Sequence, residues 1–306
     1  MKKRDFLSVK DLSSGEVFDI IKLAGKLKKK PFLYKGIFKG KTLALLFQKP
    51  SNRTRISFEV AMIHLGGYAL YLSPDEIGMG KREPVKDVGC TISRYVDAIV
   101  ARVFSHQDIV ELAHYSDVPV VNGLSDLEHP CQALSDIFTV SEKMGTLKDV
   151  VFSYVGDGNN VLNSLLFVCA KTGVHMKIAI PVGYRPLEHI FKEALEIAES
   201  TGGKIEMFED PYEAAKDSDI VYTDVWVSMG QEAEREKRLR DFALYQVNHS
   251  LMNVAKKDAF IMHCLPARRG EEITDVIDEK NSIVYDQAEN RMHVQKAVLL
   301  HLLARK

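Results

Sequence analysis

The chain has 306 residues, 46% hydrophobic and 27% charged, with 41 basic and 42 acidic side chains and a formal net charge of −1. This composition is typical of a globular protein with enough apolar residues for two domains of about 150 residues each. The balanced charge gives no field that would attract nucleic acid or an anionic membrane, and no apolar run approaches the roughly 18 residues that span a bilayer. No apolar signal core follows the basic N-terminus, so we expect a cytoplasmic protein.

The first half of the chain alternates between predicted helices and predicted strands. Residues 13–16 form a capping box that starts a first helix. Strands are expected at 42–47, 68–72, 98–103 and 118–121, and the helices between them begin near residues 51, 84 and 106. The polar, glycine-rich segment 73–82 is expected to be a loop. The helix after residue 51 is expected to gather its apolar residues near one face: Ile56, Val60, Ile63 and Leu65.

The second half of the chain repeats this alternation. Pro130 opens a helix that Gly145 breaks, and a domain boundary is expected there. Strands are then expected at 150–155 and near 177–180, 205–208, 219–223 and 259–262, with a charged helix at 233–240 and an amphipathic stripe from 294 to 303. Strands that alternate with helices predict an α/β fold with doubly wound parallel sheets. Ligands of such sheets bind at the carboxyl ends of the strands.

A candidate phosphate site follows the first predicted strand, in the segment from Phe47 to Arg55. Ser51 is a good N-cap for the next helix, and the N–H groups and dipole of a helix N-terminus favour an anion. Arg53 and Arg55 add two permanent charges that suit phosphate oxygens. The alternative from composition alone is a capped helix with two solvated arginines.

Three further segments place polar side chains at strand ends or helix starts. His129 precedes Pro130 at a helix start, where a neutral ring can donate a hydrogen bond to a carbonyl oxygen, and Gln132 follows on the same side. Asp224 ends the strand at 219–223 and is suited to bind an amine. Cys264 follows the strand at 259–262, although a buried structural cysteine is the commoner case.

The alternative from another class is a Rossmann-like, NAD-dependent dehydrogenase or a nucleotide-binding module. Gly156 and Gly158 follow a predicted strand, but Val161 stands where the third glycine of that fingerprint is expected. Pro181 stands where an acidic residue would end the next strand. The sequence contains no Ser-His-Asp order and no metal-ligand spacing, so we expect neither a metal nor another cofactor.

The order Phe-x-Lys-Pro-Ser-x-Arg-Thr-Arg resembles the carbamoyl-phosphate signature of the transcarbamoylases, with Asn52 in place of the usual threonine. His-Pro-x-Gln at 129–132 is shared with the aspartate enzymes. Asp-x-Trp-x-Ser-Met-Gly at 224–230 and His-Cys-Leu-Pro at 263–266 resemble the ornithine carbamoyltransferases more specifically. The resemblance covers nearly the whole chain, from about residue 6 to the last helix.

The resemblance implies transfer of a carbamoyl group from carbamoyl phosphate to the δ-amine of L-ornithine, giving L-citrulline and phosphate, without a cofactor. Putrescine or another amine is the closest alternative acceptor. It also implies a carbamoyl-phosphate domain at 1–142, an ornithine domain at 143–289, and a last helix, 290–306, that crosses back to the first domain. The implied assembly is a homotrimer, or a higher multiple of trimers, with sites shared between neighbouring subunits.

The roles implied by the resemblance fall on the following positions. The phosphate is held by Ser51, Asn52, Arg53, Thr54 and Arg55. The carbamoyl group is polarised by Arg102 and His129, its nitrogen is held by Gln132, Cys264 and the Leu265 carbonyl, and Arg291 contacts the same substrate. Ornithine is held by Asn160, Asp224, Ser228 and Met229, and the four residues expected to take part in catalysis are Arg102, His129, Asp224 and Cys264.

Gly78 is a second departure from the family pattern. Relatives place a glutamine or histidine of the neighbouring subunit over the phosphate, and a glycine cannot make that contact. We hypothesise that Lys81 or Arg82 of the adjacent subunit supplies the missing donor.

Overall fold

The chain folds into two compact units in a computed structural model that describes residues 3–228 and 230–304. Unit 1 takes Met1–Phe138 and Glu289–Lys306, and unit 2 takes Thr139–Ala288. Each unit contains one parallel sheet with helices on its faces, so the predicted α/β fold class is confirmed. Two helices, α6 and α12, each contain a boundary between the units.

Unit 1 is built on a four-stranded sheet in the order β2-β1-β3-β4. Its strands are β1 (Thr42–Phe47), β2 (Tyr68–Leu72), β3 (Ala98–Arg102) and β4 (Val120–Leu124). Its helices are α1 (Ser14–Lys29), α2 (Asn52–Leu65), α3 (Pro74–Ile77), α4 (Val85–Ile92), α5 (His106–Tyr115), α6 (Pro130–Met144) and α12 (Val284–Leu303).

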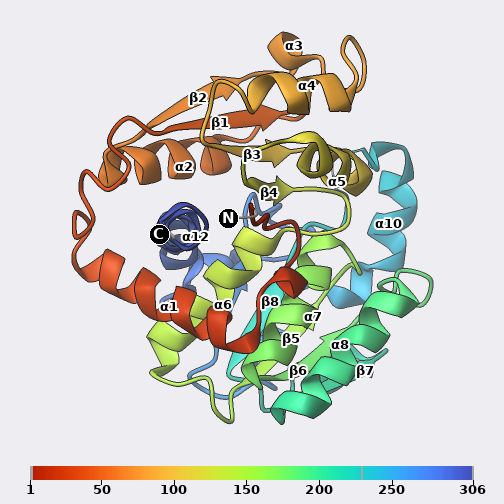
Figure 1. Cartoon of the computed structure of the whole chain (residues 1–306). Helices are drawn as coiled ribbons and strands as arrows, with labels where there is room; N and C mark the ends of the chain where they lie inside the picture. Colours follow the sequence, from red (N-terminus) through yellow and green to blue (C-terminus); the bar gives the residue numbers. More distant parts are fainter. Residues whose placement is uncertain (1–2, 229, 305–306) are drawn as a thin grey trace. The chain divides into compact units, whose positions relative to one another are not determined.

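The two faces of this sheet are covered separately because successive side chains of a strand point to opposite faces. Ala44 and Leu46 of β1 pack in one apolar cluster with Val88 of α4 and Leu112 of α5. The alternate residues of β1 are also fully buried, and α2 lies on the opposite side of the sheet from α4 (Figure 1). Both faces are therefore buried, as expected for a doubly wound sheet.

Two predicted segments of unit 1 differ from the structure. The expected strand at 118–121 begins later, at Val120, because Pro119 has no N–H to donate to the ladder. The segment expected to be a loop at 73–82 contains the short helix α3, which Ser73 and Glu76 cap reciprocally.

The predicted apolar face of α2 was wrong in part. Ile56 and Ile63 are 58% and 64% exposed, whereas Phe58, Ala61 and Leu65 are fully buried. The buried residues follow each other at intervals of three and four, which fits the helical period, and Ile56 and Ile63 fall on the other side. An apolar surface on α2 is therefore left uncovered within this chain.

Unit 2 is built on a five-stranded sheet in the order β7-β6-β5-β8-β9. Its strands are β5 (Val151–Val155), β6 (His175–Ala179), β7 (Lys204–Phe208), β8 (Ile220–Thr223) and β9 (Phe260–His263). Its helices are α7 (Asn160–Thr172), α8 (Glu188–Thr201), α9 (Pro211–Ala215), α10 (Arg235–Asp241) and α11 (His249–Met252). Helix α10 corresponds to the predicted charged helix, preceded by a 3-10 turn at Glu232–Glu234.

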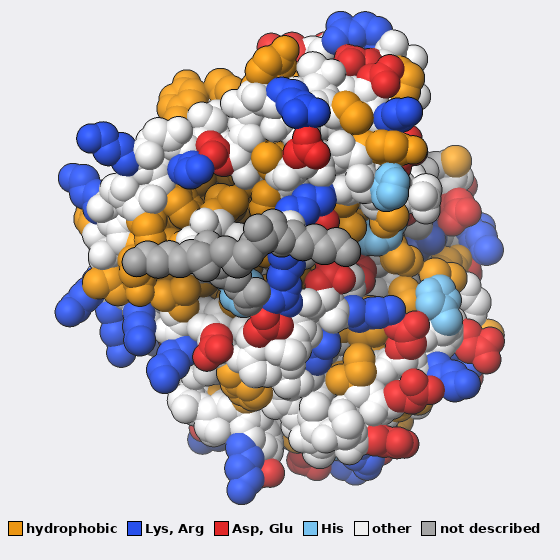
Figure 2. Space-filling model, in the orientation of Figure 1, with side chains coloured by type: hydrophobic (Ala, Val, Ile, Leu, Met, Phe, Trp, Pro, Cys, Tyr) orange, Lys and Arg blue, Asp and Glu red, His pale blue; other side chains and the backbone are white. Residues whose placement is uncertain are grey.

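Within the described residues, no helix is long and apolar enough to cross a membrane. Basic and acidic side chains are interspersed over the face seen in Figure 2, in keeping with the net charge of −1.

Gly158 explains the glycine pair that favoured the dehydrogenase alternative. A Cβ atom built at this position would lie 2.2 Å from the Tyr184 carbonyl oxygen and 2.6 Å from the Pro186 nitrogen. The glycine is therefore required by the backbone of residues 184–186, which packs against the turn after β5. A nucleotide is not needed to account for it.

We predict that Gly158→Ala destabilises the protein by about 2 kcal/mol or more, because overpacking here must displace backbone. Urea unfolding followed by circular dichroism measures the change. Gly15→Ala is the matched control, since the nearest atom to a Cβ there is the Ser13 hydroxyl oxygen at 4.0 Å. Equal stabilities of the two variants would contradict this account of Gly158.

Candidate active site

The predicted phosphate segment lies at the start of α2, directly after β1. The Ser51 hydroxyl accepts a hydrogen bond from the Thr54 N–H at 3.3 Å, which caps the helix as the sequence predicts. Thr54 is fully buried, and its hydroxyl accepts a hydrogen bond from the Arg291 guanidinium at 2.8 Å. Arg291 comes from α12, so the last helix supplies a cation to the N-terminal end of α2 within unit 1.

His129 lies at the centre of a group of cations in unit 1. Burial lowers the pKa of its imidazole well below the usual range, because the charged form would lose its hydration. Four neighbouring positive charges lower this pKa further, those of Arg291, Arg102, Lys49 and Arg53. The ring is therefore neutral at physiological pH and can act as a hydrogen-bond donor, as predicted from its place before Pro130.

Lys49 is a member of this group that the sequence analysis did not single out. Its side chain is 7% exposed, and its ammonium lies 5.0 Å from the centre of the Phe104 ring. Burial and the nearby Arg102 charge lower its pKa to about 8, against an opposing effect of Asp126. A basic residue next to the proline of the phosphate-binding turn was the sequence signal that could have found it.

Gln132 follows His129 by about one helical turn and is 1% exposed. Its amide nitrogen donates to the Asp136 carboxylate at 2.7 Å, which fixes the orientation of the amide. Its amide oxygen has no hydrogen-bond partner within the part of the chain that the structure describes. A buried acceptor of this kind is costly unless a ligand donates to it.

Two of the predicted phosphate ligands are exposed rather than buried. The Arg55 guanidinium donates to Glu59 at 2.9 Å and stacks over the Tyr71 ring at 4.0 Å, on the exposed side of α2. Asn52 is exposed at the first position of the helix. Arg53, by contrast, is close enough to His129 to lower the pKa of its ring.

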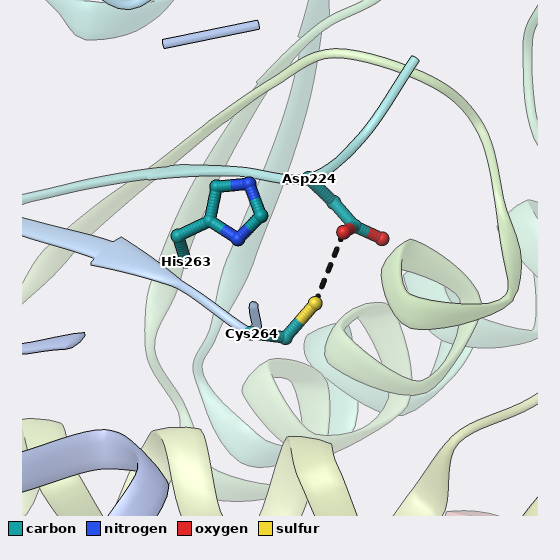
Figure 3. A group of neighbouring side chains, drawn as sticks. All are labelled: Asp224, His263 and Cys264. Atoms are coloured by element: carbon teal, nitrogen blue, oxygen red, sulfur yellow. Dashed lines mark hydrogen bonds between the residues drawn. The ribbon is translucent and has the colours of Figure 1, made fainter. Parts of the chain in front are cut away.

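A second group of polar side chains lies at the carboxyl ends of β5, β8 and β9 in unit 2. Asp224 follows β8 and is 5% exposed. One of its carboxylate oxygens accepts the thiol of Cys264 at 3.0 Å, and the other accepts the side-chain amide of Asn159 at 2.8 Å. Figure 3 shows the Cys264 thiol directed at the Asp224 carboxylate. The tertiary structure thus brings together two of the residues predicted to steer an amine.

His263 completes a group of three possible metal-ligating side chains with Asp224 and Cys264, whose donor atoms lie within 4.8 Å of one another. Both nitrogens of the His263 ring have partners, however. Nδ1 accepts the Leu265 N–H at 2.8 Å, so Nε2 carries the proton and donates to Glu272 at 3.1 Å. The side chains of His263 and Glu272 are both fully buried, and their bond holds the turn that carries Cys264.

The remaining predicted residues lie on the neighbouring turns of unit 2. Asn160 begins α7, and Leu265 adopts a left-handed backbone with φ of 58°, which is strained for a residue other than glycine. Ser228 donates its N–H to the Gln231 side chain at 3.1 Å. Met229 lies outside the described residues. The contact that the sequence analysis missed is Asn159, whose position as the N-cap of α7 was the available signal.

Comparisons with known proteins match both units. The family model for the carbamoyl-P binding domain of aspartate/ornithine carbamoyltransferase matches residues 4–142, and that for the Asp/Orn binding domain matches residues 148–302. An ornithine carbamoyltransferase of Archaeoglobus fulgidus is 53% identical, over 99% of this chain and 98% of its own. An anabolic ornithine carbamoyltransferase of Pyrococcus furiosus is 52% identical, over 97% of this chain and 95% of its own.

Solved structures give the same result. The ornithine carbamoyltransferase from Pyrococcus furiosus superimposes with a TM-score of 0.96 at 51% identity, covering 99% of this chain and 98% of that one. The ornithine carbamoyltransferase from Thermus thermophilus superimposes with a TM-score of 0.88 at 45% identity, covering 98% of this chain and 99% of that one. With family models matched in both halves and such relatives over its full length, the chain belongs to the aspartate/ornithine carbamoyltransferase family.

Proposed function

We infer that this chain is an ornithine carbamoyltransferase, which transfers the carbamoyl group of carbamoyl phosphate to the δ-amine of L-ornithine and releases L-citrulline and phosphate. The observation that supports this function is the pairing of Cys264 with Asp224 in unit 2, because a buried carboxylate beside a thiol is suited to bind an amine. The relatives at about half identity over the full chain bear the same name.

Carbamoyl phosphate is proposed to bind in unit 1, among the cations around His129. Lys49, Arg53 and Arg291 supply positive charge for the phosphate, which is the leaving group. The neutral His129 ring and Arg102 donate to the carbonyl oxygen as negative charge develops on it; one such donor contributes roughly 3 kcal/mol to transition-state stabilisation. The buried amide oxygen of Gln132 is suited to accept a hydrogen bond from the carbamoyl nitrogen.

L-Ornithine is proposed to bind in unit 2, with its amine at Asp224 and Cys264 and its amino-acid end at Asn160, Ser228 and Met229. The δ-ammonium must lose a proton before it can attack, since its pKa in water is near the lysine value of about 10.4. As the nitrogen–carbon bond forms and the carbon–oxygen bond to phosphate breaks, the departing phosphate can accept the second proton. The carbamoyl group is already activated, so the proposed reaction includes no metal and no redox cofactor.

The proposed function is tested with the purified protein, carbamoyl phosphate and a panel of amines. We expect citrulline from L-ornithine, with kcat/KM at least about tenfold above that for putrescine, because a site built to bind polar groups rejects an analogue that lacks them. Absence of citrulline would contradict the function. A preference for putrescine would instead show that the chain is a carbamoyltransferase for that amine.

We also propose that copies of this chain assemble, as a homotrimer or a multiple of it, in the cytoplasm. The apolar residues exposed on α2 and on the edge strand β2 support an interface there: Ile56, Ile63, Tyr68 and Leu70 are 43–64% exposed. Arg82 donates to the Glu76 carbonyl at 2.7 Å and so is engaged within its own loop. Exposed Lys81 is therefore the better candidate for the contact that Gly78 cannot make in a neighbouring subunit.

We predict that carbamoyl phosphate binding weakens as Lys49 loses its proton. With a pKa of about 8 for Lys49, only about a tenth of the free protein carries this charge at pH 9. The dissociation constant should therefore rise about tenfold between pH 7 and pH 9. Titration calorimetry with fresh carbamoyl phosphate measures it. Lys49→Arg should bind carbamoyl phosphate tightly at both pH 7 and pH 9, and Lys49→Met weakly at both. If the dissociation constant of Lys49→Met rose with pH as it does in the wild type, Lys49 would not be the group responsible.

We predict that Ile63→Lys dissociates the assembly, because it places a charge on the apolar surface of α2, and that it weakens carbamoyl phosphate binding at the same time. Sedimentation velocity gives the mass, and calorimetry gives the affinity. Leu244→Lys is the control, at an apolar side chain of unit 2 that is 80% exposed. Lys81→Glu should weaken binding without changing the mass. Full affinity in dissociated Ile63→Lys would exclude a shared site.

A further inference from the structure

Arg238 of α10 is a buried cation that the proposed reaction does not use directly. Its side chain is 8% exposed, and its guanidinium donates to the Asp157 carboxylate at 2.9 Å and to the Trp226 carbonyl at 3.0 Å. Nε donates to Glu234 at 3.1 Å, and the guanidinium plane stacks on the Tyr184 ring at 4.9 Å. Nη1 thus donates to two acceptors and Nε to a third, and all of these residues lie in unit 2.

The two main acceptors of Arg238 belong to the two turns that carry the proposed ornithine ligands. Asp157 lies in the turn after β5, two residues before Asn159, which binds Asp224. Trp226 lies two residues after Asp224 and two before Ser228. One guanidinium therefore joins residues 157–160 to residues 224–228, which are distant in the sequence, at the point where both turns leave the sheet.

The charges in this region give Arg238 a second effect. Asp157 is 4% exposed, and burial together with the charge of Asp224 raises its pKa to about 6, while Arg238 opposes the rise. Two buried carboxylates so close together would otherwise compete for one proton or one cation. Because Arg238 compensates Asp157, the charge of Asp224 is left for the substrate amine.

We propose that Arg238 is a positioning residue for the amino-acid substrate, which fixes the 157–160 and 224–228 turns relative to each other through simultaneous bonds to Asp157 and the Trp226 carbonyl. This inference rests on the proposed function, because it concerns the ornithine half of the same reaction. It adds a residue that contacts no substrate and whose loss is expected to act on ornithine alone. A merely structural ion pair would change stability and leave the two substrates equally affected.

The test compares Arg238→Gln, Arg238→Lys and Asp157→Asn with the control Arg235→Gln. Arg235 lies on the same helix and binds Glu271, and among the described residues it forms no hydrogen bond or ion pair with either turn. In Arg238→Gln we expect the KM for ornithine to rise about tenfold or more, because a small displacement of a ligand turn is costly. The KM for carbamoyl phosphate should stay within about twofold, since the residues proposed to hold its phosphate lie in unit 1 and Arg238 bonds to none of its proposed ligands.

A variant that keeps the positive charge separates the positioning of the two turns from the compensation of the Asp157 charge. Arg238→Lys keeps the charge but lacks the planar guanidinium, which Nε fixes through Glu234 while Nη1 donates to both turns. Its ornithine KM should therefore lie between those of the wild type and Arg238→Gln. If Arg238→Gln fails to fold, Arg238→Lys and Asp157→Asn test the proposal in its place, and both must raise the ornithine KM. An unchanged ornithine KM in these variants, or an equal rise for both substrates, overturns the proposal.

Amide hydrogen exchange gives a readout that does not depend on turnover. In Arg238→Gln, exchange should accelerate at residues 157–160 and 224–228 and remain at the wild-type rate in the core strands β5 and β6. Arg235→Gln should leave both turns protected. If the wild type formed no citrulline, the proposed function would fail, whereas accelerated exchange confined to these turns would still support the positioning role; unchanged exchange would overturn it.

Discussion

The constraint on which unit 1 depends is the meeting of four cations around one buried imidazole. Such a group is unfavourable on its own, since each charge loses hydration and repels the others. The fold enforces it by placing Lys49 and Arg53 after β1, Arg102 at the end of β3, and Arg291 on α12. An anion at its centre would stabilise the arrangement, and we propose that the phosphate of carbamoyl phosphate binds there and then departs as the leaving group.

Unit 2 presents the opposite charge. Two carboxylates, Asp157 and Asp224, lie close together at the ends of β5 and β8, and only one of them is paired with a buried arginine. The other faces the thiol of Cys264, whose turn is held by the buried His263–Glu272 pair. An enzyme that joins an anionic donor to a cationic amino acid needs two half-sites of opposite sign, and the two charged groups proposed for these roles lie at the strand ends of separate sheets.

The exposed side of α2 carries features that bear on both the proposed assembly and the proposed phosphate site. Arg55 lies on this side, over Tyr71 and beside Glu59, and the apolar residues Ile56 and Ile63 share it. The first turn of α2 thus contributes Arg53 to the cations near His129. The outer side of the same helix exposes an apolar surface. A partner copy that covered this surface would also bury the surroundings of Arg55.

The sequence by itself determined the α/β class, the order of the strands along the chain and the residues at their ends. These features follow from local periodicity, caps and breakers, so the predicted phosphate turn, Arg102, His129, Asp224 and Cys264 could be located without a structure.

The tertiary structure decided which side chains meet. Arg291 and Thr54 lie 237 residues apart, and Arg238 and Asp157 lie 81 apart. It also decided that α2 leaves Ile56 and Ile63 exposed and that burial lowers the pKa of Lys49. Contacts, exposure and pKa values of this kind depend on packing between distant segments, which no local pattern encodes.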